Sequence, residues 1–190
     1  MRRAVLALLP LIAAPAVAQT ASAPFTVVET GHTFATIDDA VQSVRTGTAT
    51  ILIAPGVYHQ CTVQAGGNIT FKAVRPGTAI CEGKAAFVLR GASSVIDGLV
   101  FRNIRVADGN GAGIRTEMGN LTVRNSMFLD SQEGILGGQP TGQQIVIERS
   151  TFTGLGTCDD ATDCAHSIYL ANRGSVTITR SRFERGRGGH

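Results

Sequence analysis

The sequence predicts an all-β solenoid, in which short parallel strands stack as successive coils. Three segments, LTVRNSMF, IVIERSTF and VTITRSRF, repeat one pattern that ends in Phe128, Phe152 and Phe183. Apolar residues recur five and seven positions before each of these phenylalanines, with polar residues between them, as in a strand with one buried face. Phe101 ends a related segment, and the intervals between the four phenylalanines are 27, 24 and 31 residues. Only the connecting loops therefore change length from one repeat to the next.

Each repeat also contains a predicted corner. The phenylalanine stands an odd number of residues after the buried positions, so a straight strand would place it on the wrong face. The chain must therefore turn between them, and small or hydrogen-bonding residues suited to turns occupy that place. The predicted corners are Gly98-Leu99, Asn125-Ser126, Arg149-Ser150 and Arg180-Ser181.

A third strand is expected after the loop that follows each phenylalanine. The segments GIRTE from Gly113, GILGG from Gly134 and HSIYLAN from His166 carry it. A repeat of three short strands cannot bury its apolar face alone, but stacked copies can, with equivalent strands about 4.8 Å apart. Phenylalanine should then stack on phenylalanine, and serine on serine.

An amphipathic helix is expected ahead of the repeats. Ile37, Ala40, Val41 and Val44 follow helical spacing, with Thr36 as the N-cap and Gly47 just beyond the end. The segment TILIAPGVYHQCTV then predicts a strand, a Pro-Gly turn and a second strand.

The chain from residue 34 to 190 resembles the right-handed parallel β-helix, or pectate-lyase-like, superfamily. The resemblance lies in the amphipathic helix, in the "PGxY" segment from Pro55 to Tyr58 and in the repeats. The resemblance implies a single-stranded right-handed coil with an N-terminal capping helix. A leucine-rich repeat is the competing solenoid, but its asparagine and leucine ladder is missing. The resemblance is specific for fold and unspecific for activity.

By register the next strand should begin near residue 189, so we expect a last coil that is uncapped or truncated.

The N-terminus reads as a signal peptide over residues 1–18, with Arg2 and Arg3 before an apolar run and small residues at the cleavage point. Residues 19–33 are expected to form an N-terminal strand or linker, and residues 34–190 the β-helix domain. Removing residues 1–18 leaves 15 basic and 14 acidic residues, a net charge of +1. We therefore expect an exported, monomeric protein, periplasmic or extracellular, with no membrane or nucleic-acid partner.

The four cysteines favour disulfides in an oxidising compartment. Of the three possible connectivities we favour Cys61 with Cys81 and Cys158 with Cys164. A zinc site is the alternative, but the spacing matches none of the usual ligand patterns.

Candidate chemistry lies on the strand that follows the long loop, where the resemblance places an extended sugar chain. If Ile114, Ile135 and Ile168 point inward, alternation exposes the residues beside them. The candidate acid/base and charge-stabilising cluster is Arg115, Glu133, His166 and Tyr169. Glu117, Arg180 and Arg182 are candidate substrate-binding residues. A lyase needs a base and a cation, and Arg115 with His166 or Tyr169 fits those roles. An outer row of solvated side chains is the competing interpretation.

The loop CDDATDC carries Asp159, Asp160 and Asp163, which are candidate calcium ligands, and no other cofactor is expected. The leading hypothesis is an exported domain that binds a polysaccharide along its coil face, with lyase cleavage of an acidic glycan as its catalytic form. The alternative is a non-catalytic surface or scaffold protein.

Overall fold

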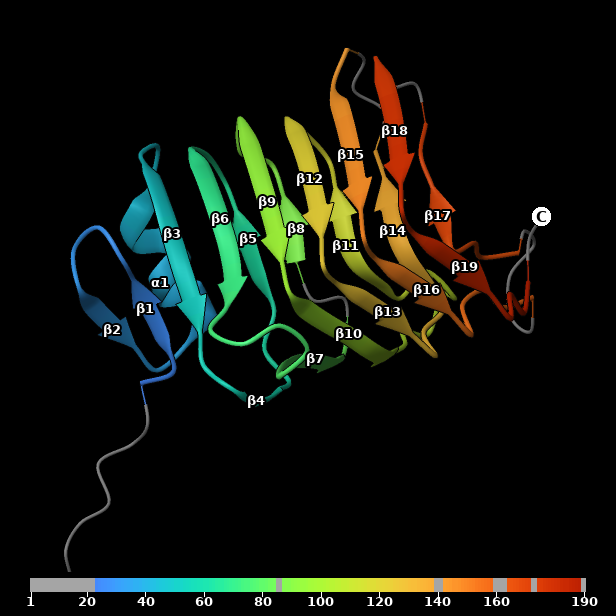
Figure 1. The fold of residues 1–190 in the computed structure, drawn as a ribbon, viewed down its shortest axis with the longest axis horizontal. Helices are drawn as coiled ribbons and strands as arrows, with labels where there is room; N and C mark the ends of the chain where they lie inside the picture. Colours follow the sequence, from blue (N-terminus) through green and yellow to red (C-terminus); the bar gives the residue numbers. More distant parts are fainter. Residues whose placement is uncertain (1–22, 85–86, 139–141, 159–163, 172–173, 189–190) are drawn as a thin grey trace, which may run out of the picture.

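The computed structural model describes residues 23–84, 87–138, 142–158, 164–171 and 174–188. These residues form three sheets of mostly parallel strands and one helix, elongated along the direction in which the strands stack (Figure 1). Sheet A contains β1 (Phe25–Val27), β2 (His32–Phe34), β3 (Thr48–Ile53), β6 (Asn68–Ala73), β9 (Ser93–Asp97), β12 (Asn120–Arg124), β15 (Gln144–Glu148) and β18 (Ser175–Thr179).

The other two sheets hold the remaining strands. Sheet B contains β4 (Gly56–Tyr58), β7 (Ala79–Gly83), β10 (Leu99–Ile104), β13 (Met127–Leu129), β16 (Thr151–Thr153) and β19 (Arg182–Glu184). Sheet C contains β5 (Thr62–Gln64), β8 (Phe87–Leu89), β11 (Ala112–Thr116), β14 (Glu133–Gly137) and β17 (Ile168–Tyr169). From β3 onward the chain visits the sheets in the order A, B, C, and every third strand pairs in parallel. We call each such set of three strands a coil. This topology is compatible with the expected β-helix.

The phenylalanine row is the clearest confirmation of the repeat. Phe101, Phe128, Phe152 and Phe183 pair in register across β10, β13, β16 and β19. Their rings stack with centroids 5.0, 4.6 and 4.7 Å apart and interplanar angles of 12°, 6° and 6°. Offset stacks of this kind add to the free energy gained by burying the rings.

The predicted corners between sheets A and B are also present. Each begins with a residue in the left-handed region: Gly98, Asn125, Arg149 and Arg180 have φ of 76°, 52°, 45° and 51°. A serine ladder then supports the turn. The N–H groups of Leu99, Ser126 and Ser150 each donate, at 3.2 Å, to the hydroxyl oxygen of the serine one coil further on, which is Ser126, Ser150 or Ser181. These bonds satisfy backbone donors that the turn would otherwise leave buried and unpaired.

The N-terminal end is covered by the helix α1 (Ile37–Val44), as expected from its spacing. Thr36 caps it, since its hydroxyl oxygen accepts from the Asp39 N–H at 3.1 Å. Ile37, Ala40 and Val41 are buried against the first coil. Next to the helix, β1 and β2 extend sheet A in antiparallel fashion.

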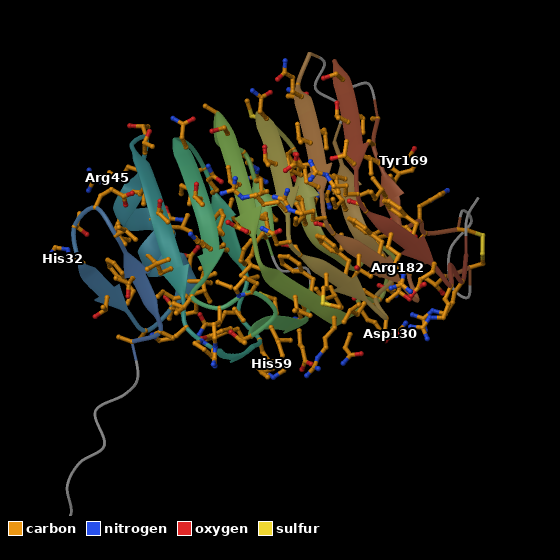
Figure 2. The ribbon with its side chains drawn as sticks, in the orientation of Figure 1. His32, Arg45, His59, Asp130, Tyr169 and Arg182 are labelled. Carbon is orange, nitrogen blue, oxygen red and sulfur yellow. A yellow bond between two sulfur atoms is a disulfide. The ribbon has the colours of Figure 1, made fainter. Side chains whose placement is uncertain are left out.

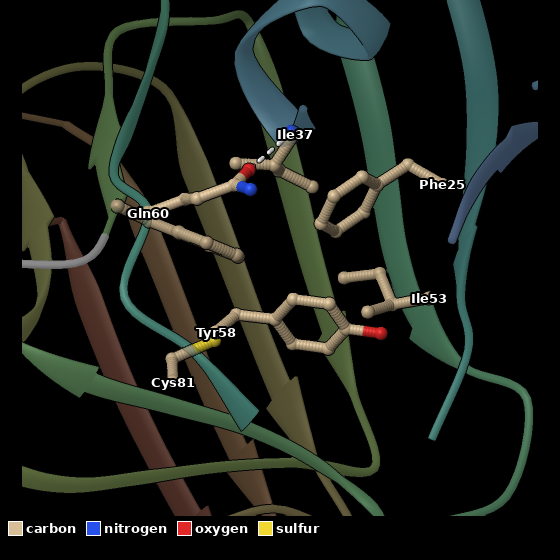
Figure 3. Close-up of a pocket in the computed structure, with 7 residues that line it drawn as sticks. Phe25, Ile37, Ile53, Tyr58, Gln60 and Cys81 are labelled. Atoms are coloured by element: carbon tan, nitrogen blue, oxygen red, sulfur yellow. Dashed lines mark hydrogen bonds between the residues drawn. The ribbon is translucent and has the colours of Figure 1, made fainter. Parts of the chain in front are cut away.

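A small apolar cavity lies under this end, lined by Phe25, Ile37, Ile53, Tyr58 and Cys81 among others (Figure 3). Its volume is about 10 Å³, room for no more than one water. It is a packing gap and too small for a sugar.

The expected disulfide between Cys61 and Cys81 is wrong, because both thiols are free. Cys81 pairs in register with Tyr58 on one side and Phe101 on the other, so it occupies the phenylalanine row and is 3% exposed. Cys61 is exposed and precedes β5 in another sheet. Burial raises the pKa of the Cys81 thiol to about 12, which leaves it inert. The predicted bond between Cys158 and Cys164 is confirmed.

At the other end, β17, β18 and β19 are the last strands of their sheets among the described residues. Val176, Ile178 and Phe183 are 44–46% exposed there, whereas the equivalent residues one coil earlier, Ile145, Ile147 and Phe152, are fully buried. The described residues contain no helix that is both long and apolar enough to cross a bilayer.

Candidate functional site

The outer face of sheet C carries a straight row of side chains. Register pairs Val63 with Val88, Val88 with Arg115, Arg115 with Leu136 and Leu136 with Tyr169. The inward neighbours Ile114 and Ile135 are fully buried, as alternation predicts. Arg115 and Tyr169 are exposed, and the strand spacing of about 4.8 Å places them about 10 Å apart with Leu136 between them. We call these five residues the sheet C row.

Two arginines share one carboxylate at the edge of this row. Arg90 Nε lies 2.6 Å from Glu117 Oε2, and Arg115 Nε lies 3.0 Å from Glu117 Oε1. The hydrogen bond from Arg90 is the main reason that the pKa of Glu117 falls below its usual range. Two guanidinium groups on one carboxylate leave the cluster with one positive charge in excess.

Glu133 lies on the next coil and is 2% exposed. The N–H groups of Gly134 and Ile135 both donate to Ser167 O, at 3.1 and 3.3 Å. A Cβ on Gly134 would lie 3.0 Å from the Phe152 ring, so Gly134 faces the core. Glu133, just before it, is buried beside the loop that carries Asp108 and the segment that carries His166.

Those loops are held in place by Gln132. Its Oε1 accepts from the N–H groups of Val106 and Gly111 at 2.8 and 2.9 Å, and its Nε2 donates to Val106 O at 3.1 Å. The Gly156 N–H donates to the Gln132 carbonyl at 2.9 Å. One residue thus ties loops of two neighbouring coils over the edge of β14.

The Glu133 carboxyl group is poorly solvated in this position. The backbone N–H of His166 hydrogen-bonds to it, while Oε2 has no hydrogen-bond partner. Burial raises its pKa to about 7, and the charge of Asp108 adds to that rise. The His166 bond and the charge of Arg115 oppose it. A carboxyl group that titrates near neutral pH is suited to proton transfer.

The four predicted cluster residues do lie near one another. Glu133 contacts the His166 backbone, Arg115 acts on it through its charge, and the rings of His166 and Tyr169 lie with centroids 5.5 Å apart. Arg115, however, is ion-paired with Glu117, and the carboxyl group of Glu133 is shielded from solvent.

The predicted substrate-binding residues are not gathered at one place. Glu117 follows β11 in sheet C, whereas Arg180 follows β18 in sheet A and Arg182 begins β19 in sheet B. Arg182 pairs with Glu184 at 3.1 Å. Figure 2 shows Tyr169 and Arg182 toward the C-terminal end of the molecule, on strands of different sheets.

The candidate calcium ligands Asp159, Asp160 and Asp163 lie outside the described residues. Within the described ranges, no three His, Cys, Asp or Glu side chains come together as a metal site.

Sequence reasoning missed Arg90 and Asp108. Arg90 follows β8 just as Glu117 follows β11, and aligning FVLR with GIRTE by register would have found the pair. Asp108 lies in a loop outside the repeat, so no periodic signal marks it.

A scan against family models and searches of curated proteins and of solved structures find no match to this chain. Its site must therefore be interpreted from its own geometry.

Proposed function

We propose that this chain is an exported, right-handed parallel β-helix that binds an acidic polysaccharide as a monomer along the outer face of sheet C. The three parallel sheets visited in turn support the coil, and the general preference of parallel crossovers supports its handedness. The bond between Cys158 and Cys164 fits an oxidising compartment.

The observation that carries the binding proposal is the sheet C row with its arginine pair. Apolar, cationic and aromatic side chains follow one another at strand spacing, with Arg90 and Arg115 outnumbering Glu117. An extended sugar chain lying across the strands would meet an aromatic ring at Tyr169 and a guanidinium group at Arg115. A guanidinium group is the side chain best shaped to bind a carboxylate with two hydrogen bonds.

Lyase-type cleavage is the catalytic form of this proposal. It would use Arg115 to stabilise the enolate-like charge beside the uronate carboxyl group, and His166, Tyr169 or Glu133 as the base. The second candidate function is a non-catalytic surface or scaffold protein. It is favoured by the burial of Glu133, which keeps the group whose pKa best suits a base away from an approaching sugar.

Binding of the mature protein to a panel of uronate and neutral polymers, with and without calcium, tests the proposal. We expect binding to at least one uronate polymer, and a loss of about fivefold to tenfold on Arg115→Ala, which removes one charged contact. Tyr169→Ala should also weaken binding, because it removes the aromatic surface.

Arg124→Ala is the matched control. Arg124 lies on β12 of the next coil, in sheet A, pairs with Asp97 at 3.1 Å and is similarly exposed. If it lowers affinity as much as Arg115→Ala, the sheet C face is not the binding surface. Absorbance of the unsaturated product reports lyase activity, and binding without that product supports the non-catalytic form.

A further inference from the structure

Glu133 is buried more completely than a charged group can readily tolerate, and few groups face it. These groups are Asp108 in the loop at 105–111, Arg115 on β11 and the His166 N–H in the segment after the disulfide. Oε2 is left without a hydrogen-bond partner. In this arrangement the neutral carboxylic acid fits, whereas the carboxylate lacks a paired cation.

Arg115 is the cation that can be released to this site. Glu117, its present partner, is held more closely by Arg90, at 2.6 Å against 3.0 Å, and would stay paired if Arg115 left. Arg115 and Glu133 lie on adjacent strands of sheet C. Ala112, the register partner of Glu133, is three residues from Arg115, which is about 10 Å along the strand. An extended arginine and a glutamate side chain span much of that separation.

We propose that Glu133 is a positioning residue that determines, through its protonation state, whether Arg115 lies in the sheet C row or turns toward the carboxylate of Glu133. The expected effect on glycan binding rests on the proposed function, whereas the movement of Arg115 does not. With Glu133 neutral, Arg115 stays beside Glu117 and is available to an anionic sugar. With Glu133 ionised, Arg115 is drawn away, so an acidic glycan binds more weakly as pH rises through neutrality.

The first test follows the Arg115 side chain itself. In the full mature chain, the Nε–Hε resonance of Arg115, assigned by its loss in Arg115→Lys, is recorded by NMR from pH 5 to pH 8.5. We expect a titration with its midpoint near neutral pH that disappears in Glu133→Gln, while Arg124 shows none. A resonance that does not move with pH in the wild-type protein would overturn the inference, whether or not the variant folds.

The second test measures affinity for a uronate oligomer across the same pH range. We expect a decrease of about fivefold from pH 6 to pH 8 in the wild type, and no such decrease in Glu133→Gln. Glu148→Gln, on sheet A, is the matched control and should follow the wild type. If no uronate binds at any pH while the Arg115 resonance titrates with Glu133, the proposed function fails and the coupling stands. Binding whose pH dependence survives in Glu133→Gln would overturn the coupling and leave the function intact.

Discussion

The carboxyl group of Glu133 is buried where its ionisation is costly. Because of this burial, the stability of the protein depends on pH. The pKa of Glu133 is about 7 in the folded chain, against 4.5 for the exposed group. Between these values the folded state holds a proton that the unfolded state has released. The free energy of unfolding therefore falls as pH rises from 4.5 to 7, by about 3 kcal/mol in total for this group.

Glu133→Gln removes this titration while keeping an oxygen to accept from the His166 N–H. Relative to the wild type, we expect the variant to gain about 2–3 kcal/mol in unfolding free energy on going from pH 5 to pH 8. Urea denaturation at the two pH values measures it. Glu148→Gln, whose side chain is 32% exposed, should show no such gain. A Glu133→Gln variant that gains nothing at pH 8 would contradict the burial that raises the pKa of Glu133.

At the scale of the strand, the sequence repeat predicted the structural features that depend on periodicity. The strands that carry Phe101, Phe128 and Phe152, their corners and their register follow from residues that must stack on their equivalents one coil away. The helix followed from its cap and its spacing. These features depend on contacts between neighbours in one repeating pattern, so the sequence displays them.

What could not be predicted depends on contacts outside the pattern. Cys81 looked like a disulfide partner because no sequence signal showed that it fills a place in the phenylalanine row. The four cluster residues of the candidate site were placed near one another by register, but the burial of Glu133 depends on loops that Gln132 ties together. Loop conformations of that kind carry no periodic signal.

In the phenylalanine row, the same substitution can be compared at a buried position and at a partly exposed one. Phe128 is fully buried between two stacked rings, whereas Phe183 ends the row and is 44% exposed. We expect Phe128→Ala to cost about 3–5 kcal/mol in unfolding free energy and Phe183→Ala less than half of that. Chemical denaturation of both variants measures the difference. Equal losses would mean that another surface covers the last ring in solution.

At the scale of the whole molecule, the two ends of the stack are unlike. Helix α1 and β1 cover the first coil, and buried apolar side chains lie directly beneath them. The last described coil instead presents Val176, Ile178 and Phe183 from the interior rows of sheets A and B. Coils that contact only their neighbours have stabilities set by their own packing and by their interfaces, so a coil with one interface should open most readily.

Amide hydrogen exchange followed by mass spectrometry should therefore show graded protection along the stack. We expect the slowest exchange in β9, β12 and β15, whose strands have a partner on both sides, and the fastest in β17, β18 and β19. Protection of β3 should stay close to that of the central strands, because β1 pairs with its outer edge. Measurement at two protein concentrations separates intrinsic stability from self-association, since only association would slow exchange in the last coil as concentration rises. Uniform protection from β3 to β19 at both concentrations would contradict this account, because β17, β18 and β19 pair on one side only among the described residues.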